Sequence, residues 1–311
     1  MMKDPRKVFE AEFDKIGAEN PLILAVSCDS AKGAGMATFI HHYPKRYVEV
    51  GISEQTAIGV CAGLAETGFK PVLAAITPFL TMRAYEQIRN DIGYTHRNVT
   101  LVGSGGGLAY STLGSSHEAI EDISLMRTIP NMVILVPGDG NEIEQALRMA
   151  IAYDGPVYLR MPRQELRDIP VDSDEKFAIG KSRTLRHGKD VLVLTYGTMI
   201  NETLDACEIL LTQGISTSVE SFLTVRPIDA QMLIQRVRDY EHIFTIEEHS
   251  RTAGFGGYIA ELLADKDFKG AQHILGVEEG SKQVGPYREI LMIHGLSAEK
   301  IAASIAAILK K

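Results

Sequence analysis

Short apolar runs alternate with longer segments of helical period along the first half of the chain. The apolar runs, which predict buried strands, are 22–27, 47–50, 71–76, 99–102, 132–136 and 157–161. The segments between them predict helices at 53–67, 79–92, 118–127 and 139–152. Strands and helices in regular alternation indicate a parallel sheet with helices on both of its faces.

A second alternation follows a break in the pattern. Residues 168–176 are polar, include Pro170 and show neither period, so we place a linker there. Beyond it, strands are predicted at 191–196, 217–221, 243–246 and 273–277, and helices at 199–213, 229–238, 256–264 and 297–309. The sequence therefore predicts an α/β fold of two doubly wound domains, spanning 1–168 and 177–311.

Composition narrows the class of protein without specifying a function. Charged residues make up 23% and the formal net charge is −8, which argues against a broad nucleic-acid or anionic-membrane surface. The first twelve residues are rich in charge and we find no 18-residue apolar run, so we expect a cytoplasmic chain without a membrane span. Three scattered cysteines, Cys28, Cys61 and Cys207, fit reduced core residues better than a metal or disulfide set.

Ligands of open parallel sheets bind beyond the carboxyl ends of the strands, so the residues after each strand are the candidates for chemistry. Glu54 follows the second predicted strand, in the first turn of a helix. There its carboxylate could bond a ligand nitrogen or only interact with the helix dipole. Phe79 follows the third strand, where its ring could stack on a planar heterocycle or fill the core.

A long connection rich in glycine and serine, 103–116, follows the fourth predicted strand. Loops of this length inside a compact domain are usually functional or disordered. Its glycines nearly fit a dinucleotide fingerprint, but Leu108 stands at the third glycine position and no helix is predicted there, so we reject NAD binding. His117 at the end of the connection could cap a helix or transfer a proton.

Six segments, kept in order and spacing, resemble the middle and C-terminal domains of transketolase, and the resemblance covers essentially the whole chain. They are 47–55, 83–89, 116–123, 125–132, 154–160 and 245–257. More narrowly, the sequence resembles the C-terminal subunit of a split, two-component transketolase. The last segment resembles the family's C-terminal domain, for which the resemblance implies a structural and dimer-forming role.

The resemblance implies a thiamine-diphosphate enzyme and assigns Glu54 as its catalytic glutamate. In the family this carboxyl group hydrogen-bonds N1′ of the aminopyrimidine, whose imino tautomer then takes the C2 proton of the thiazolium. Phe79 matches the aromatic residue that stacks on the pyrimidine, Tyr85 a second residue of the ring pocket, and Asp29 an acidic residue near the cofactor. Met82 stands where the ring pocket has an aromatic residue.

The resemblance also implies which residues meet the substrate. His117 matches an active-site histidine that contacts the donor hydroxyls, and Arg163 matches an arginine that grips the donor phosphate. Leu113, however, stands where sugar-using transketolases have an aspartate, and Gly105 and Gly33 stand where phosphate-contacting side chains are common. We therefore expect ketol transfer from an atypical small sugar or keto donor to an aldehyde acceptor.

A Gly-Asp-Gly tripeptide at 138–140 imitates the start of the family's diphosphate and magnesium motif. That motif needs an asparagine a little under thirty residues later, and none lies between Asn141 and Asn201, so we predict a turn and helix cap instead. We assign no metal-binding residue to this chain. The resemblance implies that an N-terminal transketolase subunit with the complete motif holds Mg²⁺ and the diphosphate of the thiamine diphosphate, in an α2β2 heterotetramer.

Two other functions stay open from the sequence. The beta subunit of a 2-oxoacid dehydrogenase shares this two-domain plan, although the helix at 83–89 and the loop at 116–118 favour transketolase. A non-catalytic scaffold or regulatory subunit is the remaining interpretation, and the presence of Glu54 argues against it.

Overall fold

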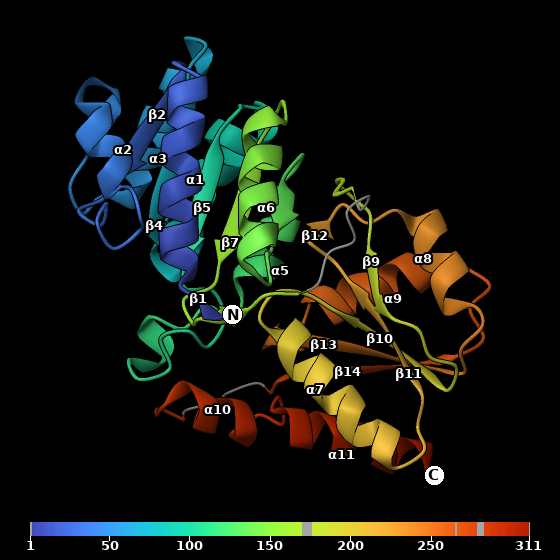
Figure 1. The fold of residues 1–311 in the computed structure, drawn as a ribbon. Helices are drawn as coiled ribbons and strands as arrows, with labels where there is room; N and C mark the ends of the chain where they lie inside the picture. The colour runs from blue at the N-terminus through green and yellow to red at the C-terminus, as the bar shows by residue number, and fades with distance from the viewer. Residues whose placement is uncertain (1, 170–175, 265, 279–282, 311) are drawn as a thin grey trace.

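Two largely parallel β-sheets, one in each half of the chain, organise the computed structural model (Figure 1), which describes residues 2–169, 176–264, 266–278 and 283–310. The first sheet has the strand order β12-β6-β7-β5-β4-β2-β3. Its strands are β2 (Ile23–Ser27), β3 (Tyr47–Glu49), β4 (Lys70–Ile76), β5 (Thr100–Ser104), β6 (Val133–Leu135), β7 (Val157–Met161) and β12 (Thr224–Arg226). All six strands predicted in the first half are confirmed, with small shifts at their ends. Only β12 is antiparallel, at the edge beside β6.

Helices cover both faces of the first sheet. α1 (Pro5–Glu19) and α6 (Gly140–Ala152) pack together on one face, and α3 (Glu54–Glu66) lies on the other (Figure 1). α1 was not predicted, yet its buried Phe9, Phe13 and Ile16 recur every three or four residues among the charges. The other helices of this half are α2 (Ala37–His42), α4 (Tyr85–Gln87) and α5 (Asp122–Arg127), with 3₁₀ turns at Pro44–Arg46 and Gly114–Ser116.

Two predicted helices of this half differ from the structure. The single helix expected at 79–92 is a π-helical turn (Phe79–Arg83), the short α4 and a second π-helical segment (Ile88–Tyr94). Wide turns of this kind are frequent at functional sites. The helix expected at 118–127 begins only at Asp122, because Ala119 is held in an antiparallel bridge to Gly107.

The second half builds a five-stranded sheet with the order β14-β13-β10-β11-β9, in which only β9 is antiparallel. Its strands are β9 (Arg183–Arg186), β10 (Val191–Thr195), β11 (Thr217–Ser221), β13 (His242–Ser250) and β14 (Ala271–Val277). Its helices are α7 (Met199–Thr212), α8 (Ala230–Val237), α9 (Phe255–Ala264), α10 (Tyr287–Ile293) and α11 (Ala298–Leu309). The four strands and four helices predicted here are confirmed. β9 and α10 were not predicted.

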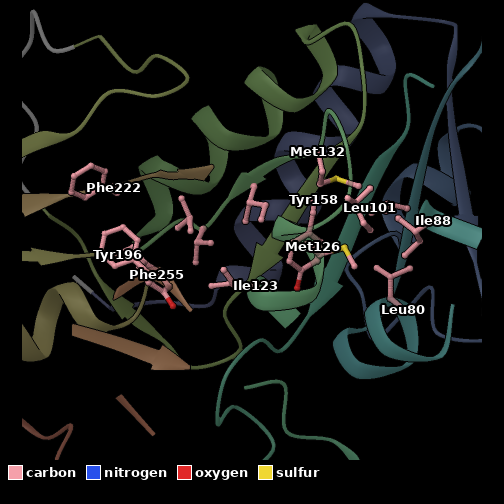
Figure 2. Close-up of a cluster of buried hydrophobic side chains, with 14 of the residues drawn as sticks. Leu80, Ile88, Leu101, Ile123, Met126, Met132, Tyr158, Tyr196, Phe222 and Phe255 are labelled. Atoms are coloured by element: carbon pink, nitrogen blue, oxygen red, sulfur yellow. The ribbon is translucent and has the colours of Figure 1, made fainter. Parts of the chain in front are cut away.

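Several contacts join the two halves. β12 comes from the second half but extends the first sheet. Within the first half, β1 (Met2–Lys3) pairs with β8 (Leu166–Arg167) in a small separate sheet. Residues 170–175 of the predicted linker lie outside the described residues. Figure 2 shows one apolar cluster in which Tyr196, Phe222 and Phe255 of the second half gather with Ile123 and Met126 of the first. The Phe255 ring centroid lies 5.2 Å from that of Tyr196 and 5.4 Å from that of Phe222.

The segment Tyr287–Leu309 is long and apolar enough to cross a membrane by length and composition alone, contrary to the absence of such a run expected above. In this structure it is two helices, α10 and α11, separated near Gly295, whose φ is +73°. Ile290, Leu291 and Ile301 from these helices are buried in the core of the second half, as expected of core helices in a folded domain. The three cysteines are buried and free, as predicted.

Candidate functional site

The residues chosen from the sequence follow strands whose carboxyl ends meet at one edge of the first sheet. Asp29 follows β2, Glu54 follows β3, Phe79 follows β4, His117 lies beyond β5, and Arg163 follows β7. These five strands pair in parallel in the order β7-β5-β4-β2-β3, so their carboxyl ends form one continuous rim. Such a rim is the usual ligand site of an open α/β sheet.

Glu54 places a buried carboxylate at this rim. It is the first residue of α3 and only 3% exposed, while the preceding Ser53 hydroxyl donates to the Val50 carbonyl at 2.9 Å and fixes the turn. Its Oε2 accepts a hydrogen bond from Nη1 of Arg83 at 2.8 Å. A buried carboxylate requires such a partner because an isolated charge is costly away from water. The site therefore presents one carboxyl group in a mostly dry surrounding.

Aromatic and basic side chains lie next to this carboxylate. The guanidinium of Arg83 lies 4.3 Å from the centroid of the Phe79 ring, in a cation–π contact. The His117 ring meets Phe79 edge to face, with 5.2 Å between centroids. The Ser116 hydroxyl lies 2.9 Å from Nδ1 of His117 and so helps to orient the imidazole. Glu54, Arg83, Phe79 and His117 thus form one continuous set of contacts.

Tyr110 extends this set toward Arg163, although sequence reasoning did not single it out. Its ring lies 6.0 Å from that of His117, and its hydroxyl accepts a hydrogen bond from Nη1 of Arg163 at 3.0 Å. Gly105 makes room for this ring. It has a φ of +75°, and a Cβ added there would lie 2.3 Å from Cε2 of Tyr110. Tyr110 therefore fills the space that a side chain at position 105 would need.

A cleft of about 200 Å³ lies at the Arg163 end of the site. Gly33, Gly105 and Arg163, which the resemblance placed near a donor phosphate, line this one cleft together with Arg6. Sequence reasoning missed Arg6. One signal could have indicated it: Asp4-Pro5 is typical of a helix start and places Arg6 in the first turn of α1. Asp4 and Glu165 also line the cleft, and Oδ2 of Asp4 pairs with Nη2 of Arg6 at 3.4 Å. The cleft therefore carries both signs of charge, and Arg163 is its candidate for contacting an anionic group of a ligand.

A larger cleft, of about 310 Å³, lies elsewhere, between α7, α10 and the segment at 164–167. It contains none of the residues predicted for the site. We place the chemistry at the strand-end rim next to the smaller cleft, because Glu54, Phe79 and His117 lie along that rim and Tyr110 connects them to the cleft.

Asp29 lies in the loop that Glu49 holds in place. Its backbone has a φ of +55°, and its N–H donates to Oε1 of Glu49 at 2.8 Å. Although partial burial alone would raise the pKa of Glu49, hydrogen bonds from Ser27, Tyr47 and two backbone N–H groups lower it to about 2. The carboxylate of Glu49 therefore stays ionised and positions the turns on either side of it.

The remaining predicted residues lie around the site in different settings. The Tyr85 hydroxyl meets the Thr128 hydroxyl at 2.6 Å, and its ring packs against the core. Met82 is half-buried in the first π-helical turn. Leu113 is 54% exposed, and its N–H donates to the Tyr110 carbonyl at 2.7 Å, so it belongs to the turn that Tyr110 begins.

The Gly-Asp-Gly tripeptide is a helix cap, as predicted. Asp139 is fully buried; its Oδ1 accepts from the N–H of Glu142 at 2.7 Å, and its Oδ2 accepts from the N–H of Ile169 at 2.8 Å. Both carboxylate oxygens thus hold backbone groups. Within the described ranges, no group of three or more His, Cys, Asp or Glu side chains is arranged to hold a metal ion.

These features define a two-domain α/β protein with a carboxylate, aromatic rings and a cleft lined by Arg163 along one sheet edge. The sequence models of two families match it: Transketolase, pyrimidine binding domain, over residues 2–169, and Transketolase, C-terminal domain, over residues 180–301. The chain belongs to the transketolase family.

Relatives of matching length are separate subunits. An apulose-4-phosphate transketolase subunit of Phocaeicola vulgatus is 30% identical over 306 residues, covering 98% of this chain and 97% of that protein. A solved structure described as a split gene transketolase, inactive beta4 tetramer, matches with a TM-score of 0.90 at 31% identity, covering 99% and 98% of the two chains. The chain therefore corresponds to the C-terminal subunit of a split transketolase.

Longer relatives contain this chain as one part. The 1-deoxy-D-xylulose-5-phosphate synthase of Symbiobacterium thermophilum is 33% identical over 304 residues, which are 97% of this chain but 46% of that protein. The chain spans about half the length of such relatives. Both kinds of match support the family and fold predicted from the sequence.

Proposed function

We propose that this chain forms the pyrimidine side of a thiamine-diphosphate site in a two-subunit enzyme that transfers a two-carbon ketol unit to an aldehyde. The observation that carries the proposal is the buried carboxyl group of Glu54, set at the strand-end rim beside the Phe79 ring. Membership of the transketolase family supports the cofactor class.

The residues present fit an aminopyrimidine. Glu54 offers a carboxyl group that can share a proton with ring atom N1′, and Phe79 offers an aromatic face for stacking. Arg83 spans both groups here, but its side chain is 46% exposed and can leave the ring face while keeping contact with the carboxylate. When bound, thiamine diphosphate supplies the nucleophilic carbon of the reaction. The role of Glu54 is to hold the N1′ proton.

The diphosphate and Mg²⁺ would be held by a partner subunit with a complete Gly-Asp-Gly and asparagine motif. In this chain Asp139 already uses both oxygens to accept backbone N–H groups. Relatives of matching length support a divided enzyme, since one is named as a transketolase subunit and another is described as an inactive tetramer of beta chains. An α2β2 assembly would place each pyrimidine site against a partner's diphosphate site.

The donor would lie along the contacts from His117 to the cleft at Arg163. His117 and the Tyr110 hydroxyl can meet polar groups of the donor, and Arg163 can hold an anionic end, whereas Arg6 already pairs with Asp4. Leu113 offers no hydrogen bond to a donor hydroxyl. We therefore propose a donor that has an anionic end but lacks, or does not use, the hydroxyl that an acidic side chain at 113 would bind. The name of the P. vulgatus relative, which contains a sugar phosphate, is consistent with an anionic end.

The test is Glu54→Gln in the assembled two-subunit enzyme, read by hydrogen–deuterium exchange at C2 of thiamine diphosphate. Glutamine keeps the shape but cannot share a proton with N1′, so exchange and turnover should each fall by ~10²-fold or more. The matched control is Glu86→Gln, an exposed residue on α4, which should leave both rates unchanged. Unchanged C2 exchange in Glu54→Gln would remove Glu54 from this role.

The dehydrogenase alternative predicts a different reaction. A beta subunit of a 2-oxoacid dehydrogenase would support acyl transfer to a lipoyl domain, which a transketolase-type enzyme does not need. The two transketolase family matches favour the transferase. Acyl transfer to lipoyl domains at rates above ketol transfer would reverse that preference. A non-catalytic subunit would show neither activity in the assembled complex.

A further inference from the structure

The five-stranded sheet has its own crevice of the kind that binds ligands. The chain leaves β10 for β11 on one side, while β13 pairs with β10 on the other side. The reversal of strand order beside β10 creates a crevice at the carboxyl ends, the usual ligand position in a doubly wound sheet. Thr198, after β10, and Glu248, near the end of β13, mark this crevice.

The glycine-rich loop of the N-terminal half fills the crevice. Leu108 is 2% exposed and belongs to the same buried apolar cluster as Val193, Ile246 and Val277 of the second half. Its N–H donates to Oε1 of Glu248 at 2.7 Å. A loop residue from one domain thus occupies the place where the other domain would bind a ligand.

Several buried hydrogen bonds hold the Glu248 carboxylate in position for this contact. It is 1% exposed, and besides Leu108 its carboxylate accepts hydrogen bonds from the hydroxyls of Thr198 and Tyr287, the latter at 2.8 Å. Burial raises the pKa of Glu248, while the charge of Arg160 lowers it. Gly107 allows the close approach, because it has a φ of +69° and a Cβ there would lie 2.5 Å from Oε1 of Glu248.

The contact between Leu108 and Glu248 lies at the base of the loop that carries Tyr110 and His117. Gly107 and Ala119 exchange two backbone hydrogen bonds of 2.9 Å, which close the loop between them. A second contact joins its middle to the C-terminal half, where the Ser111 hydroxyl donates to the Gly285 carbonyl at 2.9 Å. In Figure 1 the green segment after β5 accordingly extends away from its own sheet toward α10.

We propose that Glu248 is a positioning residue: it anchors the loop base through Leu108 and thereby fixes Tyr110 and His117, so that the C-terminal domain holds the donor-binding wall of the site. The link to donor binding rests on the function proposed above, whereas the anchoring of the loop does not. The C-terminal domain then has a direct part in substrate binding as well as an architectural one.

The experiment compares Glu248→Ala with Glu247→Ala in the full chain. Glu247 is a matched control, since it is equally buried on the same strand but accepts from the N–H groups of Phe255 and Gly256 at 2.7 and 2.9 Å, within its own domain. In Glu248→Ala, amide hydrogen exchange across residues 105–118 should become about 10- to 100-fold faster, the scale of one lost buried hydrogen bond. In Glu247→Ala the exchange of this loop should stay within about 3-fold of the wild type, after correction for any global loss of stability measured by urea unfolding.

Two further variants keep the test decisive. Leu108→Ala removes the apolar anchor and leaves Glu248 in place, so it should release the same loop even where Glu248→Ala fails to fold. Glu248→Gln keeps an acceptor oxygen for Leu108 and should restore most of the protection. In the assembled enzyme, release of the loop should raise the KM for the donor by about 10-fold or more, with a smaller effect on kcat.

Exchange in the loop decides the proposal independently of catalysis. Loop protection that is unchanged in both Glu248→Ala and Leu108→Ala overturns it, as does an equal effect of Glu247→Ala. If the loop is released but no partner gives ketol transfer, the anchor stands and the proposed function fails.

Discussion

At the scale of single residues, Gly105 and Tyr110 show how one missing side chain changes the lining of a site. A side chain at 105 is impossible beside the present Tyr110 ring, and the Tyr110 hydroxyl contacts Arg163 instead. Where related enzymes commonly have a polar side chain, position 105 is therefore a glycine, and the phenol of Tyr110 occupies the space of that side chain. We expect the choice of donor to depend on this replacement and on Leu113 in the adjoining turn.

Leu113→Asp should shift donor preference in the assembled enzyme toward donors with a hydroxyl group at the second carbon. Leu113 is 54% exposed, so the substitution removes little buried apolar surface. A new carboxylate near the donor can accept a hydrogen bond worth ~1–3 kcal/mol, which predicts a change of about 10- to 100-fold in relative kcat/KM.

The measurement is a panel of ketose phosphates, unphosphorylated ketoses and 2-oxoacids with wild type and variant. Leu211→Asp, at a similarly exposed leucine on α7, is the control and should leave the ranking unchanged. If xylulose 5-phosphate is already as good a donor as in ordinary transketolases, Leu113 does not determine the donor.

At the scale of elements, β13 and α5 meet through a buried histidine. His249 Nδ1 donates to the Ser250 carbonyl at 2.8 Å, and its Nε2 accepts from the N–H of Ser124 at 3.4 Å, an arrangement that requires the neutral imidazole. Burial lowers the pKa of His249 from 6.5 to about 4, against the opposing effect of Asp122. Glu247 also faces the ring, with 3.8 Å between Oε2 and Nδ1.

Wild-type stability relative to His249→Gln should fall as the pH is lowered from about 6.5 to about 4. In that interval the unfolded chain binds a proton at this histidine and the folded chain does not, so the stability contributed above pH 6.5 is lost progressively. The full change is on the order of 3 kcal/mol, at 1.36 kcal/mol for each pKa unit.

Urea unfolding of both proteins at several pH values measures this difference. For His41→Gln, at an exposed position of α2, the difference in free energy of unfolding from wild type should not decrease in this way between pH 6.5 and 4. A wild-type advantage over His249→Gln that is constant between pH 4 and 7 would show that the histidine is not held neutral.

The elements that could be predicted from the sequence are those whose pattern is local. The buried parallel strands were found because their apolar runs are short and bounded by polar turns, and α3, α6 and α7 because their apolar residues follow a helical period. The helix α1 was missed because charge dominates its composition. The π-helical turns at Phe79–Arg83 and Ile88–Tyr94 could not be predicted, because over so few residues their apolar positions have the same spacing as those of an ordinary α-helix.

The residues of the candidate site also divide into those that a local sequence pattern indicates and those that it does not. Glu54, Phe79 and His117 could be selected because each follows a predicted strand of the sheet, and Arg163 because it matches an arginine of the family that the sequence resembles. Other contacts depend on segments far apart in the chain, and no local pattern encodes them. Examples are Arg6 at the cleft and Leu108 against Glu248, which is 140 residues away.

At the scale of the whole molecule, the two halves share one apolar cluster (Figure 2). Phe222 is 1% exposed and lies beside Phe255 within it, and β12 follows Phe222 directly into the first sheet. Because side chains of both halves complete the same core, unfolding of one half should expose the core of the other. The chain should therefore unfold as one cooperative unit.

Phe222→Ala should lower the free energy of unfolding by about 3–5 kcal/mol, the usual cost of truncating a buried phenylalanine. Differential scanning calorimetry should show one transition in both proteins, moved to lower temperature in the variant. Phe69→Ala, at a partly exposed phenylalanine before β4, should cost much less. Two separate transitions in the wild type would contradict a shared core.

The division of the thiamine-diphosphate site between two subunits is the central claim, and calorimetric titration with thiamine diphosphate and Mg²⁺ tests it most directly. The purified chain alone should bind the cofactor only weakly, because its Gly-Asp-Gly tripeptide serves as a helix cap. The complex with an N-terminal transketolase subunit should bind it tightly, at about one cofactor for each copy of this chain. Micromolar binding of the cofactor by this chain alone would contradict the account.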